Sequence, residues 1–434
     1  MIQFHKRTVA ANTFAVFFLM FYCSQNLFAQ YNDDEVLPQL SYLYDRPNLL
    51  PTMEKMNLIS AGGMVKLNSN AIPLGLGLRI MTGGAIEDKH KKSLLTFPGK
   101  RRNIEIDIKA GLHYQRRLEK SGIHIYVGYY YRNIHFGNVT TDLVKLALEG
   151  NNQFEDKKAD FSKMNFESVQ YNQYSVGIGK EFNNLYAAAM LSFIQGNNDV
   201  QIKNKDGYMY TAPYGEYIDF AYGFEYNQAH KGAPKFFKPY GLGFSADLHL
   251  SYKLSKGMIL FDVEDLGFIQ WGNESFNYAN DTTIRYEGLD IGDVLGLNLN
   301  TGSLINTDTL LKHVIAEKTT NKYKTVLPAT FMIAYSFRTQ LKNTPIQLNF
   351  GLSTRIMSKY YAMAYAKANF FLPKNVVTSV SMSGGGYSVF NLGWDIGYQS
   401  ENIDFVIGTH NLLGLLAINY YPSTSCNLRF AYKF

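Results

Sequence analysis

Apolar and polar residues alternate along many segments of this chain. In residues 104–115 Ile, Ala, Leu and Tyr occupy the even positions, whereas charged and polar side chains fill most odd positions. Residues 245–253, 346–353 and 390–397 repeat the pattern. A period of two is that of a β-strand, whose successive side chains point to opposite faces. Segments of about ten residues also match the length of a tilted strand that crosses the hydrocarbon layer of a membrane.

Short polar connectors separate neighbouring alternating segments. They lie at residues 120–122, 183–184, 255–257 and 373–375. Connectors of this length and composition predict β-hairpins. The candidate strands number about fourteen to sixteen, and single-chain transmembrane barrels usually have an even number of strands.

The long connectors do not alternate regularly with the short ones. If successive predicted strands alternate in direction, the connectors at residues 83–102, 136–164 and 196–214 lie at one end of the barrel, whereas the connector at residues 271–323 lies at the other. A strand miscounted between residues 215 and 240, or an N-terminal strand outside the barrel, would explain the mismatch. The end of the barrel at which each loop lies therefore stays open.

The composition favours a barrel over a bundle of membrane helices. The chain contains 32 Tyr and 30 Phe, and its mean hydropathy is −0.17. After residue 29 it lacks the run of about eighteen apolar residues that marks a spanning helix. Alternating strands with Tyr and Phe girdles are typical of transmembrane barrels. We therefore predict an all-β fold over residues 56–434, a transmembrane antiparallel β-barrel of about 14 to 16 strands with short helices in its long connectors.

The N-terminal region is predicted to lie outside the barrel wall. A short positive segment followed by an apolar run predicts a secretory signal peptide over residues 1–29, cleaved after Ala29. Residues 30–55 contain three prolines and predict an irregular segment, which is expected either to run into the lumen as a plug or to lie under it. Cleavage would leave Cys426 as the single cysteine, which excludes an internal disulfide.

Two short helices are predicted inside the long connectors. Thr141–Glu149 has Thr141 as a capping residue, an apolar stripe, and Gly150 at its end. Residues 308–317 show a second apolar stripe with helical spacing. Short amphipathic helices of this kind are expected to pack as caps or plugs.

The chain ends in an alternating strand. Leu428, Phe430, Tyr432 and Phe434 share one face. This ending resembles the terminal strand of outer-membrane barrels, in which the last aromatic residues are the signal read by the barrel-insertion machinery. The resemblance implies that Phe430, Tyr432 and Phe434 form that signal. It also implies that the protein lies in the outer membrane of a Gram-negative cell, with lipid and the insertion machinery as partners.

Several further stretches resemble a family of uncharacterised outer-membrane barrels from Bacteroidota. They are Asp142-Leu143 with Glu149-Gly150-Asn151, the segment Asp265–Trp271, the segment Val326–Thr330, and Asn427–Phe430. That family is one of unknown function, so the resemblance implies a barrel and no activity. More distantly, the chain is similar to fatty-acid-transporter-type barrels, one of which serves the type IX secretion system.

Charged and polar residues on the alternating strands are candidates to line the lumen, because a charge on the lipid face is costly. Their signs are mixed, whereas an ion-selective pore concentrates one sign at a constriction. We therefore expect a filled or narrow lumen. The lumen-facing candidates are Glu105, Asp107, Lys109, His113, His124, Asp247, Lys253, Asp395 and Arg429.

The remaining residue patterns give little evidence for a catalytic or ligand-binding site. His113 and His124 flank a hairpin turn, but no third ligand accompanies them, so we predict no metal site. In the segment Asp265–Trp271, Asp265 is a candidate binding group, but Phe268 and Trp271 suit an interfacial girdle at a strand end, and we favour this structural interpretation. No nucleotide-binding motif and no G-x-S-x-G motif is present, and we predict no cofactor and no catalytic residue.

Three functional hypotheses follow. The first is transport of a small amphiphilic or hydrophobic ligand through a plugged barrel. The second is a structural or secretion-accessory role in which long connectors dock an envelope protein. The third is an outer-membrane hydrolase, which the missing nucleophile motif disfavours. The net charge of +6 comes with no basic and aromatic cluster, so a nucleic-acid partner is excluded.

Overall fold

The computed structural model describes residues 57–229, 239–272, 275–287, 319–341, 344–357 and 359–434, with gaps between residues 74 and 99. The predicted signal peptide, the predicted plug over residues 30–55 and the predicted helix over residues 308–317 lie outside this part of the chain. Within it, no helix is both long enough and apolar enough to cross a membrane.

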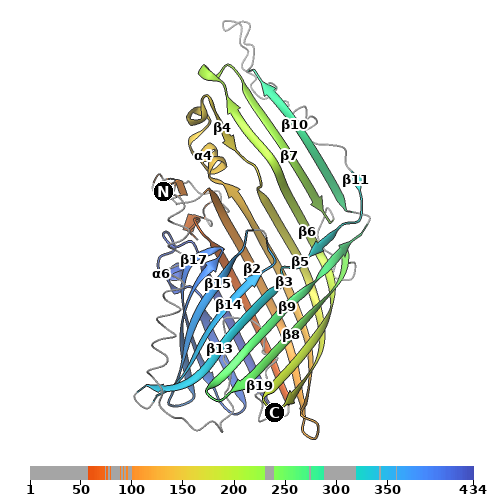
Figure 1. The fold of residues 1–434 in the computed structure, drawn as a ribbon, viewed down its shortest axis with the longest axis vertical. Coiled ribbons are helices and arrows are strands. Elements are labelled where there is room, and N and C mark those ends of the chain that lie inside the picture. Colours follow the sequence, from red (N-terminus) through yellow and green to blue (C-terminus); the bar gives the residue numbers. More distant parts are fainter. Residues whose placement is uncertain are drawn as a thin grey trace.

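The described residues form an antiparallel sheet that closes into a barrel of fourteen strands (Figure 1). The closure joins the first and last strands, because β1 pairs with both β2 and β19. The wall strands, in order around the barrel, are β1 (Asn57–Ser69), β2 (Arg101–Leu118), β3 (Ile123–Thr140), β5 (Asn165–Phe182), β6 (Leu185–Thr211), β8 (Gly241–Leu254), β9 (Gly257–Trp271), β13 (Thr330–Leu341), β14 (Thr344–Arg355), β15 (Tyr361–Leu372), β16 (Val376–Gly386), β17 (Ser388–Gln399), β18 (Ile403–Thr409) and β19 (Thr424–Lys433).

The wall is apolar outside and polar inside, the reverse of a water-soluble protein. Val176, Leu191 and Phe244 are each more than 60% exposed and point outward. Their neighbours on the same strands, such as Ser175 and Ser192, are buried on the inner face. Lipid solvates such an outer face, whereas water would not. The predicted fold class is therefore confirmed, with 14 strands as the correct number.

In the described part of the chain, the short turns lie at the end of the barrel that carries Asn57 and Phe434, except the tight turn at Tyr387 between β16 and β17, which lies at the other end. The N–H of Asn57 donates to the carbonyl of Phe434 at 3.0 Å, and residues 119–122, 183–184 and 255–256 turn at the same end. The strand ends that the long connectors join lie at the other end. The parity mismatch in the sequence arose because β7 (Ile218–Gln228) is a strand outside the wall.

A sheet extends beyond the wall at the loop end, and we call it the blade (Figure 1). β6 continues upward past the wall and pairs with β7, and β7 pairs in turn with β10 (Phe276–Tyr286). The 3-10 turn η1 (Asn152–Phe154) precedes β4 (Lys157–Asp160), which pairs with the tip of β6, and η2 (Pro213–Gly215) forms the tip of the β6–β7 hairpin. The connector between β10 and β13 contains two short strands, β11 (Thr319–Thr320) and β12 (Lys324–Val326).

The helix α4 (Thr141–Glu149) has the predicted bounds and contributes to a small core beside the blade. Its N-cap is Thr140, one residue before the predicted cap, and the Thr140 side chain accepts from the N–H of Leu143 at 3.3 Å. Leu143 and Leu146 pack against the cluster of Phe154, Ala159, Phe161 and Met209. A last short helix, α6 (Leu412–Leu416), lies between β18 and β19.

Candidate functional site in the barrel lumen

Two carboxylates on β2 and one arginine on β14 meet across the lumen. Glu105 and Asp107 are buried on the inner face of β2, and Arg355 is the last residue of β14. Because β2 is the second and β14 the ninth of the fourteen wall strands, these residues come from opposite sides of the barrel. Arg355 pairs with Glu105 and lies 3.1 Å from Asp107. A side-chain bridge therefore crosses the barrel.

Arg132 on β3 extends this set of charges toward β9. Its guanidinium lies 3.2 Å from Asp265 and 3.9 Å from Asp107. Asp265 also accepts from the Gln173 amide at 3.1 Å, and its backbone N–H donates to Asp247 at 2.6 Å. Asp265 has φ 55°, a left-handed conformation uncommon outside glycine, beside a register shift between β8 and β9. The irregular backbone thus places its carboxylate within reach of Arg132.

Lys66 on β1 completes the set, with its ammonium 3.5 Å from Glu105, which also accepts from the amide of Asn68 at 2.9 Å. Three cations thus meet three carboxylates, so the set carries no dominant sign. Such balanced, mutually paired charges join the walls of a lumen, whereas a selective pore needs one sign at its constriction. The cross-lumen network, as we name it, consists of Lys66, Glu105, Asp107, Arg132, Asp265 and Arg355.

Nearer the loop end, the lumen contains an apolar cluster built around Trp271. Trp271 is fully buried, and its indole N–H donates to the hydroxyl of Thr325 at 2.7 Å. The predicted interfacial position of Trp271 is therefore wrong, because a residue at the end of β9 points inward here; Phe268 does lie outside. The mouth cluster comprises Ile134, Phe136, Val169, Tyr171, Ile194, Ala229, Ile269, Trp271, Leu327 and Tyr387.

The turn end of the lumen contains histidine and tyrosine. His113 lies 3.2 Å from the Tyr130 hydroxyl, and His124 lies 3.2 Å from the amide of Gln115. Both histidines are buried, as expected for inward positions. In the described part of the chain, no three His, Cys, Asp or Glu side chains are grouped to hold a metal ion.

The remaining lumen candidates are distributed around the wall. Asp395 is buried and accepts from Lys367 and from Ser379, each at 2.8 Å. Arg429 is half-buried, and Lys253 is exposed near the turn end. Lys109 and Asp247 are buried. The aromatic residues of the C-terminal strand face outward, and they are Phe430, Tyr432 and Phe434, each between 43% and 48% exposed.

The arginines of the cross-lumen network were missed in the sequence. Arg132 lies on a strand with tyrosine on both faces: Tyr130 points inward and Tyr129 outward, so the alternation of β3 gives no clear inner face. Arg355 lies two residues after a clear alternating segment, at a strand end where the alternation no longer predicts which face a side chain takes. The phase of Ser353, which is buried, would have identified Arg355 as inward.

A comparison with solved structures finds matches of low sequence identity. The P. putida toluene transporter TodX has 8% sequence identity and a TM-score of 0.41 over 88% of this chain and 91% of that one. The Ralstonia pickettii toluene transporter TbuX has 9% identity and a TM-score of 0.41, covering 89% and 91%. A Pseudomonas aeruginosa FadL homologue has 6% identity and a TM-score of 0.42, covering 88% and 91%.

A comparison with curated proteins found no match. A family model does match, over residues 82–410, which include the wall strands from β2 to β18 together with the cross-lumen network except Lys66. The described function of that family is unknown. Because the match covers most of the sequence, the chain belongs to the family of unknown function DUF5723.

Proposed function

We propose that this protein is an outer-membrane transporter that moves a small amphiphilic or hydrophobic ligand through a lumen closed at rest. The observation that carries the proposal is the bridge from Arg355 to Glu105 and Asp107, which joins opposite walls. A general diffusion pore would need an open aqueous path at this height. A barrel shut by paired charges passes a solute only when the charges rearrange.

The order of chemistry along the lumen supports an amphiphilic ligand. The mouth cluster presents Trp271, Tyr171 and Phe136, whose rings suit a hydrocarbon tail. The arginines of the cross-lumen network suit an anionic or polar head, because a guanidinium binds carboxylate and phosphate with two parallel hydrogen bonds. A ligand with both parts would place its hydrocarbon tail in the mouth cluster and its polar head against the arginines of the cross-lumen network.

The two tryptophans of the chain provide a direct test. Trp271 lies inside the mouth cluster, whereas Trp394 is 41% exposed on the lipid face. In protein with Trp394→Phe, reconstituted into vesicles, a fatty acid carrying a nitroxide on its chain should quench Trp271 with saturation. The matched variant Trp271→Phe should show only the linear quenching of a membrane-partitioned probe. Linear quenching of both variants would count against a luminal ligand site.

The blade favours a second candidate function, docking of an envelope protein. Tyr214 at the tip of the blade is 95% exposed and holds φ 58°, so the hairpin presents this ring to solvent. A photo-crosslinking amino acid at position 214 should form one reproducible adduct in intact envelopes, and the same amino acid at the buried position 391 should form none. Equal labelling at both positions would exclude docking at the tip.

A further inference from the structure

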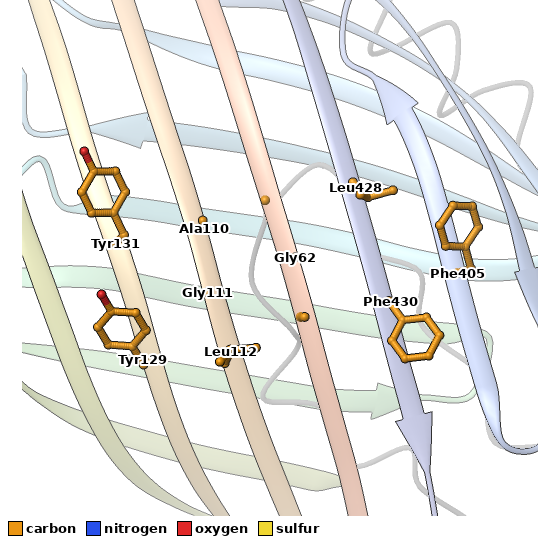
Figure 2. Close-up of a pocket in the computed structure, with 11 residues that line it drawn as sticks. Gly62, Ala110, Gly111, Leu112, Tyr129, Tyr131, Phe405, Leu428 and Phe430 are labelled. Atoms are coloured by element: carbon orange, nitrogen blue, oxygen red, sulfur yellow. The ribbon is translucent and has the colours of Figure 1, made fainter.

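The lipid-facing wall contains a groove of about 490 Å³ where the first strand, β1, pairs with the last, β19. Figure 2 shows this part of the wall, with Tyr129 and Tyr131 on one side and Phe405, Leu428 and Phe430 on the other. Between them, the outward residues Ala61 and Gly63 of β1 and Ala110 of β2 are small. The groove therefore runs across the closure of the barrel.

The strand register explains why the wall is hollow here. Across one row, Tyr131 of β3 pairs with Ala110 of β2, Ala110 with Gly63 of β1, and Gly63 with Leu428 of β19. Two adjacent strands thus lack a large outward side chain at the same height. Strands lie about 4.8 Å apart, so the large side chains on β3 and β19 stand about 14 Å apart.

In a second row the hollow narrows to the width of one strand. Tyr129 pairs with Leu112, Leu112 with Ala61, and Ala61 with Phe430. Leu112 is a large outward side chain, so Ala61 alone is small in this row. On β1 the next outward residues are Ile59 and Val65, which are 47% and 51% exposed and limit the groove along the strand. The span from one to the other is about 20 Å, at about 3.3 Å per residue.

The lining admits only an apolar occupant. Its two hydroxyls already have partners on β5, because Tyr129 donates to Asn172 at 3.1 Å and Tyr131 accepts from Gln170 at 2.9 Å. No charged side chain lines the groove. The rings, rather than the hydroxyls, are therefore available to a ligand.

We propose that this groove binds one hydrocarbon chain of a membrane lipid as a fixed partner of the barrel. The groove is continuous with the outer face that lipid solvates, so acyl chains are the molecules that reach it at the highest concentration. It is long and narrow, as an extended acyl chain is, whereas the convex wall of a second barrel would bridge over it. Binding here rests on van der Waals packing, since a chain that leaves the groove stays in hydrocarbon.

Filling the groove tests the proposal. Ala110 is exposed and already carries a Cβ, so Ala110→Leu adds bulk without backbone strain; Ala61→Leu is a second filling variant. Ala189→Leu on the lipid face of β6 is the matched control. The purified barrel would be incubated with palmitoyl-oleoyl phosphatidylethanolamine, washed in mild detergent and weighed by native mass spectrometry.

We expect one lipid retained by the unmodified protein and by Ala189→Leu, and about a tenfold loss of retention for either filling variant, because the added side chain replaces the packing contacts of the acyl chain. The shift of gel mobility on boiling reports that each variant is folded. Equal retention by all four proteins would overturn the proposal. So would a Cys426–Cys426 disulfide dimer in membranes that the filling variants abolish, because Cys426 is exposed two residues from Leu428 and would then report a second copy in the groove.

Discussion

Arg355 joins β14 to β2 across the lumen, and Arg355→Met removes that link while keeping a long side chain. Glu105 would retain Lys66 at 3.5 Å and the amide of Asn68 at 2.9 Å. Asp107 would retain Arg132, at 3.9 Å. One carboxylate charge in a buried set of three would then be uncompensated. Removing one partner of a buried ion pair costs about 3–5 kcal/mol, and the remaining cations reduce the expected loss to about 2–3 kcal/mol.

Two measurements follow this change. Urea unfolding in lipid vesicles, monitored by tryptophan fluorescence, should show the lower stability. Planar-bilayer recording should show more frequent and larger open events, because the walls are no longer held together at this height. Arg285→Met is the matched control, since Arg285 pairs with Asp219 in the blade at 2.7 Å and is exposed to solvent. It should change neither the conductance nor the unfolding midpoint of the barrel.

A double variant separates lost charge balance from lost packing. Glu105→Gln together with Arg355→Met removes one charge of each sign, so the stability should recover in part while the conductance stays high. If Arg355→Met left both the midpoint and the conductance unchanged, the bridge would not close the lumen, and the proposed transport mechanism would lose its basis. If the double variant showed no open events in the planar bilayer, side-chain packing rather than the ion pair would be what closes the lumen.

Three smaller predictions address local parts of the fold. Thr140→Ala removes the side-chain cap of α4 and should cost that helix about 1 kcal/mol, measured as faster amide exchange in α4 alone. Gly243→Ala should abolish barrel assembly, because the added Cβ would collide with a backbone oxygen of β9, whereas Gly272→Ala, whose Cβ has only one ordinary contact, should assemble. The hydrogen bond from Arg285 lowers the pKa of Asp219. The pair therefore contributes its full stability to the blade above the ordinary Asp pKa of about 4, and that stability is lost only as the pH falls through the lower pKa of the folded state. Amide exchange in β7 and β10 should rise only in that acid range.

The wall strands were predictable because lipid and lumen impose opposite demands on alternate residues. In β2, Ile106 and Ile108 point outward, whereas Glu105, Asp107 and Lys109 are buried inside. The contrast is largest in strands of ten to eighteen residues that lie wholly in the wall. Their hairpin turns were also predictable, because short polar connectors fix the pairing of neighbours.

β6 shows why the loop end was not predictable in the same way. Its inward residues are even-numbered up to Ile194 and odd-numbered from Asn197 to Gln201, because an extra residue is inserted opposite β5. A second irregularity follows between Asn204 and Asp206, where β6 pairs with β7. A β-bulge of this kind exchanges the faces of every later residue. The alternation therefore hid a strand of 27 residues that leaves the wall and enters the blade.

The cross-lumen network could not be predicted for a different reason. Glu105 and Arg355 are 250 residues apart in sequence and belong to strands that never pair. Alternation shows that Glu105 points inward, but the residue it meets depends on the number of strands and on the stagger accumulated around the whole barrel. One strand more or fewer would rotate Arg355 away from Glu105 and leave a buried charge on each side. The closed lumen thus depends on the global geometry of the barrel, and a substitution that changes strand number or register should open it even when every charged residue is kept.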